Sequence, residues 1–392
     1  MGEIPPLALS FDDVLVLPGL SQVLPGDVGL DTKLGKNIDL KIPVLSSAMD
    51  TVTESELAIA LAREGGLGVI HRNCLIDFQA EQVARVKRSE NSVIQSPHTV
   101  RPETVLGELT RLMREKGVSG FPVIDPDGRL LGMVTSRDMW YLENENTPVR
   151  EMMTPRERLI VGTPQTGLEE ALKILYTHRI EKLPLVDDQG RLVGLITKQD
   201  IIKRQMFTSA AKDSNGQLLV GAAVGVGDDC VDRALAMQAA GADAVFIDAA
   251  TGHTSRVMSV IQRLREALGD RTPVVAGNVV TAQGATDLCD AGASAVKVGV
   301  GPGSICTTRI ISGVGMAQFS AVREAADVCR ARGVSVIADG GIRYSGDIVK
   351  AIAGGADLVM LGSLLAGTSE SPGSMVKWQG RTFKEDRGMG SL

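Results

Sequence analysis

Aromatic side chains, net positive charge and long apolar runs are all scarce in this sequence. Aromatic residues make up 3% of its 392 residues, and the formal net charge is −6. An aromatic binding platform and a general nucleic-acid surface are therefore excluded. No run approaches the ~18 apolar residues of a membrane span, and residues 1–10 lack the basic start and apolar core of a signal peptide. We expect a cytoplasmic protein that binds neither nucleic acid nor membranes.

Cysteine and histidine are also few and scattered. The five cysteines form no Cys-x-x-Cys pair and the four histidines lie far apart in the chain, so we expect no zinc site. An odd number of cysteines without a secretion signal is typical of free thiols in a reducing cytosol.

An internal repeat interrupts the chain. Residues 117–139 align without a gap on residues 179–201. Each copy predicts a strand, a tight turn, a second strand and the start of a helix, and an amphipathic helix precedes each copy.

This repeat resembles the tandem cystathionine-β-synthase (CBS) module. We place the module at 92–204, with a first repeat at 92–147 and a second at 148–204. The alternatives are a structural spacer and a purine-nucleotide sensor. For a sensor, the resemblance implies that four residues at matched positions contact the regulatory nucleotide: Thr135, Asp138, Thr197 and Asp200.

The rest of the chain is rich in glycine, with 44 residues in the whole sequence, and hydrophobic residues make up 44%. This favours small-residue packing and many strand-to-helix turns. Removing 92–204 leaves roughly 280 residues, close to the size of a (β/α)8 barrel. These residues contain eight apolar runs, as strands buried on both faces require: Ile42–Ser46, Leu67–His71, Leu218–Val224, Ala244–Asp248, Pro273–Asn278, Ala295–Gly299, Ser335–Asp339 and Asp357–Gly362. We predict an α/β fold, a catalytic TIM barrel formed by 1–91 and 205–392, with the tandem module inserted after its second strand and helix.

The most specific segment is Gly299–Arg309, a glycine-rich loop that directly follows the sixth predicted strand. Most single cysteines are small packing residues, but here the neighbours of Cys306 are glycine, serine and threonine, which offer little to pack against. Backbone N–H groups and a nearby hydroxyl increase the thiolate fraction of such a cysteine. Cys306 is therefore a candidate nucleophile.

Glycines after the last two predicted strands form a candidate phosphate site. Barrels of this class often bind phosphate with these two loops, which here are Asp339–Gly341 and Gly362–Ser363. Glycines expose backbone N–H groups to an anion. Because Asp339 would repel phosphate, its natural partners are the ribose hydroxyls. The alternative for these glycines is simple turn formation.

Four segments together resemble the IMP dehydrogenase / GMP reductase family: Ser46–Glu54, Gly299–Arg309, Ala338–Arg343 and Arg387–Ser391. The resemblance covers essentially the whole chain, including the CBS pair. It implies an NAD-dependent oxidoreductase that converts IMP to XMP, the committed step of guanine nucleotide synthesis. Cys306 would attack C2 of the hypoxanthine ring, a hydride would leave for NAD⁺, and the covalent thioimidate would be hydrolysed with help from Thr308.

The resemblance also implies the remaining ligands. For IMP it implies Ser47, Met49, Ser304, Asp339, Gly340, Gly341, Gly362, Ser363, Gly388, Met389 and Gly390. For NAD it implies Asp248, Asn278, Gly299, Val300 and Gly301, and for a potassium ion the backbone carbonyls of Gly301, Gly303 and Cys306. It further implies a homotetramer, with an octamer as the alternative.

Three positions depart from the family pattern. Ala249 and Thr251 replace the usual threonine and histidine, and Asp386 stands where a phosphate-binding tyrosine is usual. Members of the family also continue beyond the Gly-Met-Gly-Ser segment into a flap whose arginine activates water. A chain that ended at Leu392 is expected to form the thioimidate once and to hydrolyse it slowly.

Three other functions stay open at this stage. GMP reductase shares the Cys-Thr-Thr loop and the barrel. An FMN-dependent barrel oxidoreductase would use Asp339–Arg343 and Leu361–Ser363 to hold a flavin phosphate. A nucleotide sensor with an inactive barrel is disfavoured because Cys306 and Thr308 are both present.

Overall fold

The computed structural model describes residues 7–89, 94, 97–142, 144–199, 202 and 207–388. The chain divides into two compact units. The first unit comprises Met1–Glu90 and Ser209–Leu392, and the second comprises Asn91–Thr208. The limits predicted for the inserted module, 92 and 204, fall close to these boundaries.

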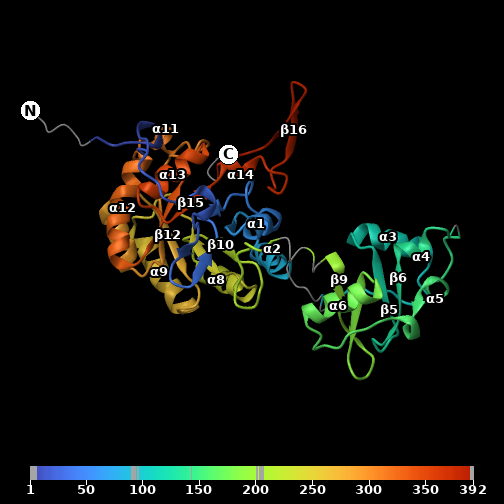
Figure 1. Ribbon diagram of the computed structural model, residues 1–392. Coiled ribbons are helices and arrows are strands. Elements are labelled where there is room, and N and C mark those ends of the chain that lie inside the picture. The colour runs from blue at the N-terminus through green and yellow to red at the C-terminus, as the bar shows by residue number, and fades with distance from the viewer. Residues whose placement is uncertain are drawn as a thin grey trace, which may run out of the picture. The chain divides into compact units, whose positions relative to one another are not determined.

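Eight parallel strands close into a barrel in the first unit (Figure 1). They follow one another around the barrel in chain order, and β15 pairs with β3 to close it. The predicted TIM barrel is therefore confirmed, and all eight apolar runs are strands: β3 Val44–Ser46, β4 Leu67–Ile70, β10 Val220–Val224, β11 Ala244–Ile247, β12 Val274–Val279, β13 Ala295–Val298, β14 Ser335–Asp339 and β15 Leu358–Leu361.

Amphipathic helices surround the strands, each with its apolar face on the barrel. Thr254 and Thr281 start two of them with side-chain caps, because their hydroxyls accept from Val257 N and Gly284 N respectively. The main helices are α1 Ser55–Arg63, α2 Ile76–Arg88, α8 Cys230–Ala239, α9 Ser255–Leu268, α10 Ala282–Asp290, α12 Gln318–Arg332 and α13 Ser345–Ala353. Two shorter ones, α11 Thr308–Ser312 and α14 Ser363–Ala366, lie in the loops that end β13 and β15.

Apolar side chains fill the barrel interior. Phe246 is fully buried there, and it fits because Gly221 on the neighbouring strand has no side chain: a Cβ would lie 2.6 Å from the ring. A hairpin of β1 Thr32–Leu34 and β2 Ile38–Leu40 adds Leu34 and Leu40 to the same core. Gly35 N donates to Ser335 Oγ at the start of β14, so the hairpin closes the N-terminal end. We therefore expect the ligand cavity at the C-terminal end of the barrel, as in other barrels of this class.

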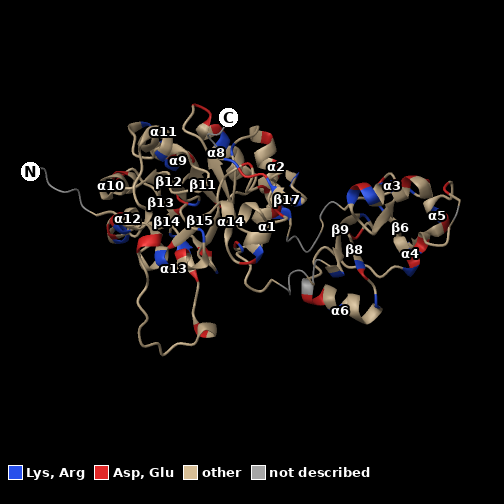
Figure 2. Cartoon of the chain, turned by 90° about the horizontal axis from the view of Figure 1, so that it is seen from above, with Lys and Arg blue, Asp and Glu red and all other residues tan. Residues whose placement is uncertain are grey.

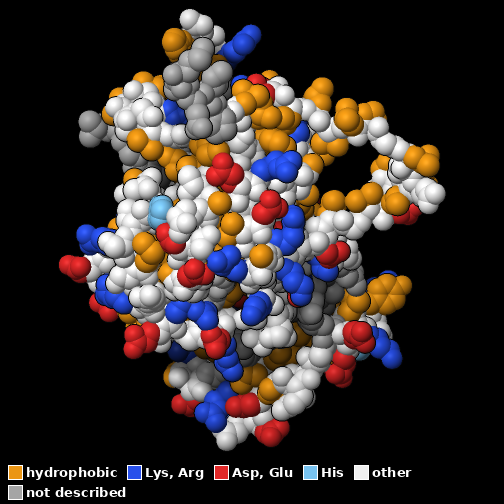
Figure 3. Space-filling view, turned by 90° about the vertical axis from the view of Figure 1, so that its left-hand side faces the viewer, with side chains coloured by type: hydrophobic (Ala, Val, Ile, Leu, Met, Phe, Trp, Pro, Cys, Tyr) orange, Lys and Arg blue, Asp and Glu red, His pale blue; other side chains and the backbone are white. Residues whose placement is uncertain are grey.

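Two segments stand away from the barrel. An arm of residues 14–31 exposes apolar side chains, with Leu15, Leu17 and Leu20 each more than four-fifths exposed. The arm is the loop of orange side chains that leaves the body in Figure 3. The other segment is an antiparallel hairpin of β16 Met375–Trp378 and β17 Arg381–Lys384.

The second unit shows the symmetry of the sequence repeat. Leu130 N donates to Gly190 O and Leu192 N donates to Gly128 O, both at 3.0 Å, so equivalent turns of the two copies pair reciprocally. Gly117 and Arg179 end matched helices in the left-handed conformation. Residues 92–147 contain α3 Leu106–Lys116, β5 Gly120–Ile124, β6 Leu130–Thr135 and α4 Ser136–Met139. Residues 148–204 contain α5 Val149–Met152, β7 Thr154–Pro155, α6 Leu168–His178, β8 Lys182–Val186 and β9 Leu192–Thr197. Strand β7 pairs with β6, so the start of the predicted second repeat completes the sheet of the first.

Within the described ranges, the protein has no helix with both the length and the apolar character needed to cross a membrane.

Candidate active site

A cavity of about 820 Å³ lies at the C-terminal end of the barrel, within the volume range of small-molecule sites. Most residues predicted to bind substrate, dinucleotide or potassium line it. Met389 and Gly390 lie outside the described residues. The predicted residues that line the cavity are Ser47, Met49, Asp248, Asn278, Gly299, Val300, Gly301, Gly303, Ser304, Cys306, Thr308, Asp339, Gly340, Gly341, Gly362, Ser363 and Gly388.

Cys306 is half-buried in the loop between β13 and α11. Its backbone N donates to Gly303 O at 3.1 Å, which forms a tight turn. Its Sγ donates to Thr308 Oγ1 at 3.3 Å, so the thiol already has a hydroxyl partner. The loop passes close to Arg309, because a Cβ on Gly301 would lie 2.5 Å from the Arg309 side chain. A thiol and a neighbouring hydroxyl are thus held together on a glycine-rich turn.

Asp339 ends β14, the strand that pairs with β13, so it lies next to the cysteine loop. Its Oδ2 accepts from Asn278 Nδ2 at 2.8 Å and lies 3.7 Å from Lys297 Nζ. Its Oδ1 makes no hydrogen bond with any described residue, so one carboxylate oxygen is available to a ligand hydroxyl. Gly340 and Gly341 follow with φ of +85° and +76°, conformations that glycine adopts without strain.

Gln318 at the start of α12 links two of these loops. Its Nε2 donates to Val298 O at 2.8 Å and to Asp339 O at 3.1 Å. Gly299 must lack a side chain here, because a Cβ would lie 2.3 Å from Asp339 O. The buried Gln318 Oε1 has no partner among the described residues.

Asp248 follows β11 and pairs with Arg72, whose Nε lies 2.9 Å from Asp248 Oδ2. Ala249 lines the cavity beside it. The dinucleotide carboxylate predicted from the sequence therefore has a cationic partner.

Asp50 contacts Arg387, one of the last described residues of the chain. Asn73 Nδ2 and Arg387 Nη2 donate to its Oδ2 at 2.8 and 2.7 Å. Burial raises the pKa of Asp50, but these two hydrogen bonds outweigh it and hold the pKa below its usual range. Asp386, which replaces the usual tyrosine, accepts from Thr51 Oγ1 at 3.2 Å and is not among the cavity-lining residues.

Sequence reasoning missed Arg72, Lys297 and Gln318, although all three line the cavity. Lys297 interrupts an otherwise apolar strand, so a charge inside a predicted buried run was an available signal. Arg72 comes directly after a predicted strand end, which is where catalytic side chains occur in this fold. Nothing in the local sequence distinguishes Gln318 from other helix-start residues.

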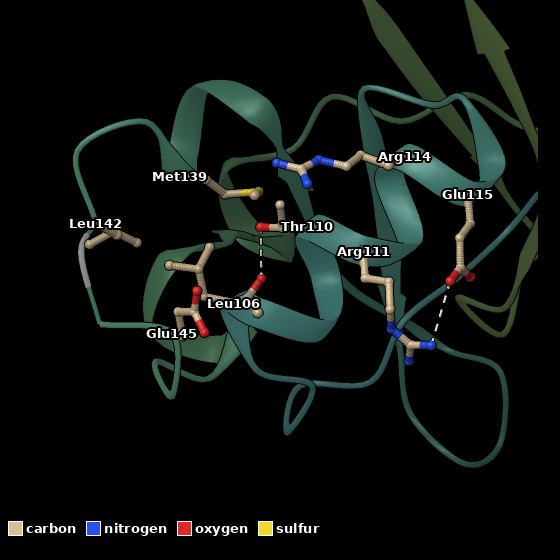
Figure 4. A pocket seen from close by; sticks show the side chains of 9 residues that line it. Leu106, Thr110, Arg111, Arg114, Glu115, Met139, Leu142 and Glu145 are labelled. Atoms are coloured by element: carbon tan, nitrogen blue, oxygen red, sulfur yellow. Dashed lines mark hydrogen bonds and ion pairs between the residues drawn. The ribbon is translucent and has the colours of Figure 1, made fainter.

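A second cavity of about 510 Å³ lies in the second unit, on α3 and the loop after α4. Figure 4 shows the Arg114 side chain extending toward Met139, whereas Arg111 points toward Glu115, with which it forms an ion pair.

The three predicted nucleotide contacts that the structure describes in the second unit, Thr135, Asp138 and Thr197, are not among the residues that line this second cavity. Thr135 N and Thr135 Oγ1 both donate to Asp138 Oδ2 at 2.7 Å, so this carboxylate caps its own helix. Thr197 ends β9 at the matched position, and Asp200 lies outside the described residues. In the described part of the chain, no group of three or more His, Cys, Asp or Glu is arranged to hold a metal ion.

Comparison with known proteins agrees with this geometry. A family model described as "IMP dehydrogenase / GMP reductase domain" matches residues 8–392. Inosine-5'-monophosphate dehydrogenase of Aquifex aeolicus (strain VF5) is 52% identical over 386 residues, which cover 98% of this chain and 78% of that protein. The same-named protein of Streptococcus pyogenes serotype M3 is 53% identical over 385 residues, with 98% and 78% covered.

Solved structures agree as well. A variant of GMP reductase from Trypanosoma brucei in complex with guanosine 5'-monophosphate superposes with a TM-score of 0.92 at 41% identity, over 99% of this chain and 82% of that one. The same reductase with guanosine 5'-triphosphate gives 0.87 at 42% identity, over 94% and 88%. With the barrel, the cysteine loop and these matches together, the chain belongs to the IMP dehydrogenase / GMP reductase family.

Proposed function

We propose that this chain oxidises IMP to XMP with NAD⁺. The observation that carries the proposal is the Cys306 thiol, 3.3 Å from the Thr308 hydroxyl, in a cavity that Asp339 and two glycine loops also line. Curated relatives that are 52–53% identical carry the name inosine-5'-monophosphate dehydrogenase.

Cys306 acts as the nucleophile. Its sulfur forms a bond to C2 of the hypoxanthine ring, the C2 hydrogen leaves with its electron pair, and a thioimidate remains on Cys306. Water then adds at C2, the C–S bond breaks, and XMP and the thiol are released. Thr308 is within reach of the sulfur and carries protons in the two steps.

The two glycine loops and Asp339 hold the nucleotide. Backbone N–H groups of Gly340, Gly341 and Gly362, with the Ser363 hydroxyl, bind the phosphate. The free oxygen of Asp339 accepts from a ribose hydroxyl. Ser47 and Met49 lie beside Gly362, within 4 Å of the position that its Cβ would occupy, and would contact the base. By the family pattern Ser304, Gly388, Met389 and Gly390 complete this set.

We propose that the same cavity also binds a dinucleotide and a monovalent cation. Asp248, Val300 and the close-approach glycines Gly299 and Gly301 would hold NAD⁺, which supplies a hydride acceptor. Asn278 holds Gly299 and Asp339 in place, because its amide donates to both Gly299 O and Asp339 Oδ2. Backbone carbonyls of Gly301, Gly303 and Cys306 lie on one loop and would bind potassium, because carbonyl oxygens suit a weakly hydrated cation.

The test is a paired assay. IMP with NAD⁺ should give XMP and NADH, whereas GMP with NADPH should give no consumption of NADPH. GMP reductase is the second candidate function, because the structures with TM-scores of 0.92 and 0.87 carry that name. NADPH oxidation with GMP, without NADH formation from IMP, would replace the proposal with that function.

For the second unit we propose a tandem CBS module that binds purine nucleotides through Thr135, Asp138, Thr197 and Asp200. The reciprocal pairing of Leu130 with Gly190 and of Leu192 with Gly128 supports two equivalent halves. Calorimetry of the full chain with ATP, GTP and AMP tests this, and a chain lacking 91–208 is the control. Equal heats from the two proteins would leave only a structural spacer.

We further propose a cytoplasmic homotetramer. All five cysteines are free thiols, which persist in a reducing compartment. The apolar arm over residues 14–31 supports association with further copies of this chain, because solvent exposure of such a surface is unfavourable. Light scattering should give the mass of a tetramer, and Leu17→Glu with Leu20→Glu should lower it. The exposed neighbour Gln22→Glu is the matched control.

A further inference from the structure

Two cysteines outside the cavity meet between neighbouring helices of the outer layer. Cys289 lies near the end of α10 and Cys329 near the end of α12, and their Sγ atoms are 3.8 Å apart, in a mutual hydrogen bond. The two helices are adjacent at the edge of the barrel in Figure 2. A disulfide bond is ~2.05 Å long, so the sulfurs need to approach by about 1.8 Å.

The two thiols differ in access and in charge. Cys329 is fully buried, whereas Cys289 is half-buried and reachable from solvent. The hydrogen bond from Cys329 lowers the pKa of the Cys289 thiol, burial opposes this, and the Arg332 guanidinium adds to the lowering. Arg332 is held in place by Asp290, whose Oδ1 lies 3.1 Å from Arg332 Nε and whose charge works in the opposite direction, raising the pKa of the Cys289 thiol. Cys289 is therefore the more accessible and the more readily deprotonated thiol of the pair.

No other pair among the five thiols, all of which lie in described parts of the chain, makes such a contact. Cys306 pairs with Thr308, and Cys74 lies against His71 O at 3.7 Å. Burial raises the pKa of the Cys74 thiol, which lowers its reactivity. The contact between Cys289 and Cys329 is thus specific to one place in the fold.

We propose that Cys289 and Cys329 form a dithiol site that a peroxide-class oxidant converts to a disulfide, joining α10 to α12. The Cys289 thiolate attacks one oxygen of hydrogen peroxide, the O–O bond breaks, and the departing hydroxide takes a proton to become water. The Cys329 sulfur then displaces the hydroxyl of the resulting sulfenic acid, which leaves as a second water. The two thiols lose two protons and two electrons in total, and the peroxide gains them.

The disulfide stabilises the barrel without entering the active-site cavity. Neither sulfur lines the cavity. Helix α10 follows β12, which carries Asn278, and α12 precedes β14, which carries Asp339. The bond therefore joins two strand–helix segments of the barrel that already meet through the Asn278–Asp339 hydrogen bond. Because it cross-links the unfolded chain over a long loop, it raises the unfolding temperature.

The test uses the full chain with Cys306→Ala, which removes the thiol of the cavity loop. The protein is treated with one equivalent of hydrogen peroxide, quenched with N-ethylmaleimide and digested without reduction. We expect one cross-linked peptide pair containing Cys289 and Cys329, the loss of two alkylatable thiols, and an unfolding temperature raised by several degrees. Dithiothreitol should reverse all three changes.

The matched control is Cys289→Ser in the same background, which should give no cross-link and no rise in unfolding temperature. Arg332→Gln should slow the reaction severalfold, because it removes the cation beside Cys289. The fully buried Cys329 is left unchanged, so that a folding defect does not obscure the result. The proposal is overturned if Cys289 is oxidised to a sulfinic acid while the Cys329 peptide stays unmodified, or if Cys329 cross-links to another cysteine.

Discussion

At the residue scale, the cavity depends on polar side chains that hold one another before any ligand binds. Asn278 is the clearest case. The sequence predicts it as a dinucleotide contact, but its amide is committed to Gly299 O and Asp339 Oδ2. A strand end can be recognised from its apolar run, whereas the direction of an amide depends on partners 21 and 61 residues away.

Lys297 is expected to keep Asp339 in position for IMP binding. Its side chain is about nine-tenths buried and lies next to the Asp339 carboxylate, so Lys297→Met leaves a partly buried carboxylate with one partner fewer. We expect KM for IMP to rise by about tenfold or more, about 1.4 kcal/mol, with a smaller change in kcat. Lys297→Arg keeps the charge and should recover part of the loss. An unchanged KM in the methionine variant would remove Lys297 from the positioning of Asp339.

At the element scale, the eight strands follow from sequence because each is an apolar run buried on both faces. Their ends are less predictable. His71, Asp248, Gly299 and Gly362 stand one residue beyond the strands, since backbone pairing stops where the loops turn toward the cavity. The β1–β2 hairpin and the arm before it carry no periodic signal and were not predicted.

Glycines at the ends of these strands are not equivalent. A Cβ on Gly299 would lie 2.3 Å from Asp339 O, whereas one on Gly303 would make only an ordinary contact, 3.7 Å from Cys306 Cβ. Gly299→Ala should therefore displace the Asp339 loop and lower kcat/KM by about 100-fold or more, of the order seen when catalytic geometry shifts by ~1 Å. Gly303→Ala in the same loop should stay within about tenfold of the parent. Steady-state kinetics of the two variants measures this difference. Similar losses of kcat/KM in both variants would contradict the close packing of Gly299 on Asp339.

A helix start predicts a pH effect. Asp347 is buried near the N-terminus of α13 and accepts from Arg343 N and Tyr344 N at 3.0 and 3.1 Å. Burial raises the pKa of Asp347, but the two backbone hydrogen bonds and Lys350 outweigh it, and the net shift is downward. A lowered folded-state pKa gives stability that is present above the unfolded value near ~3.9 and is lost as pH falls through the folded pKa.

Asp347→Asn should therefore destabilise the protein at neutral pH by more than at acid pH. Urea unfolding of both proteins across this range measures the difference. A difference independent of pH would show that the Asp347 charge adds no stability.

At the scale of the whole molecule, the barrel holds a buried ion cluster close in sequence to both ends of the insertion. Lys87 Nζ, near the end of α2, lies 2.9 Å from Asp213 Oδ2 and 2.9 Å from Asp243 Oδ2. Asp213 stands shortly after the second unit, so the cluster holds together the two chain segments that lead to and from it. Burial raises the pKa of Asp243, with Lys87 opposing the rise.

From this arrangement we expect the barrel to fold without the insertion. A chain with 91–208 replaced by a short linker should keep the barrel folded, since the join falls between residues that the cluster already fixes. Lys87→Met should destabilise both the full and the shortened chain by about 3–5 kcal/mol, because it leaves two carboxylates without their cation. Chemical denaturation measures both, and a barrel that unfolds on excision alone would contradict the two-unit organisation.

The central claim is that Cys306 forms a covalent bond to the purine. Rapid mixing with IMP and NAD⁺, followed by acid quench and peptide mass mapping, measures it directly. We predict a nucleotide adduct on the peptide containing Cys306, formed together with NADH, and neither product from Cys306→Ser, which should still bind IMP because a serine hydroxyl is a far weaker nucleophile than a thiolate. NADH formation by Cys306→Ser within about tenfold of the parent, or an adduct on a residue other than Cys306, would contradict the account.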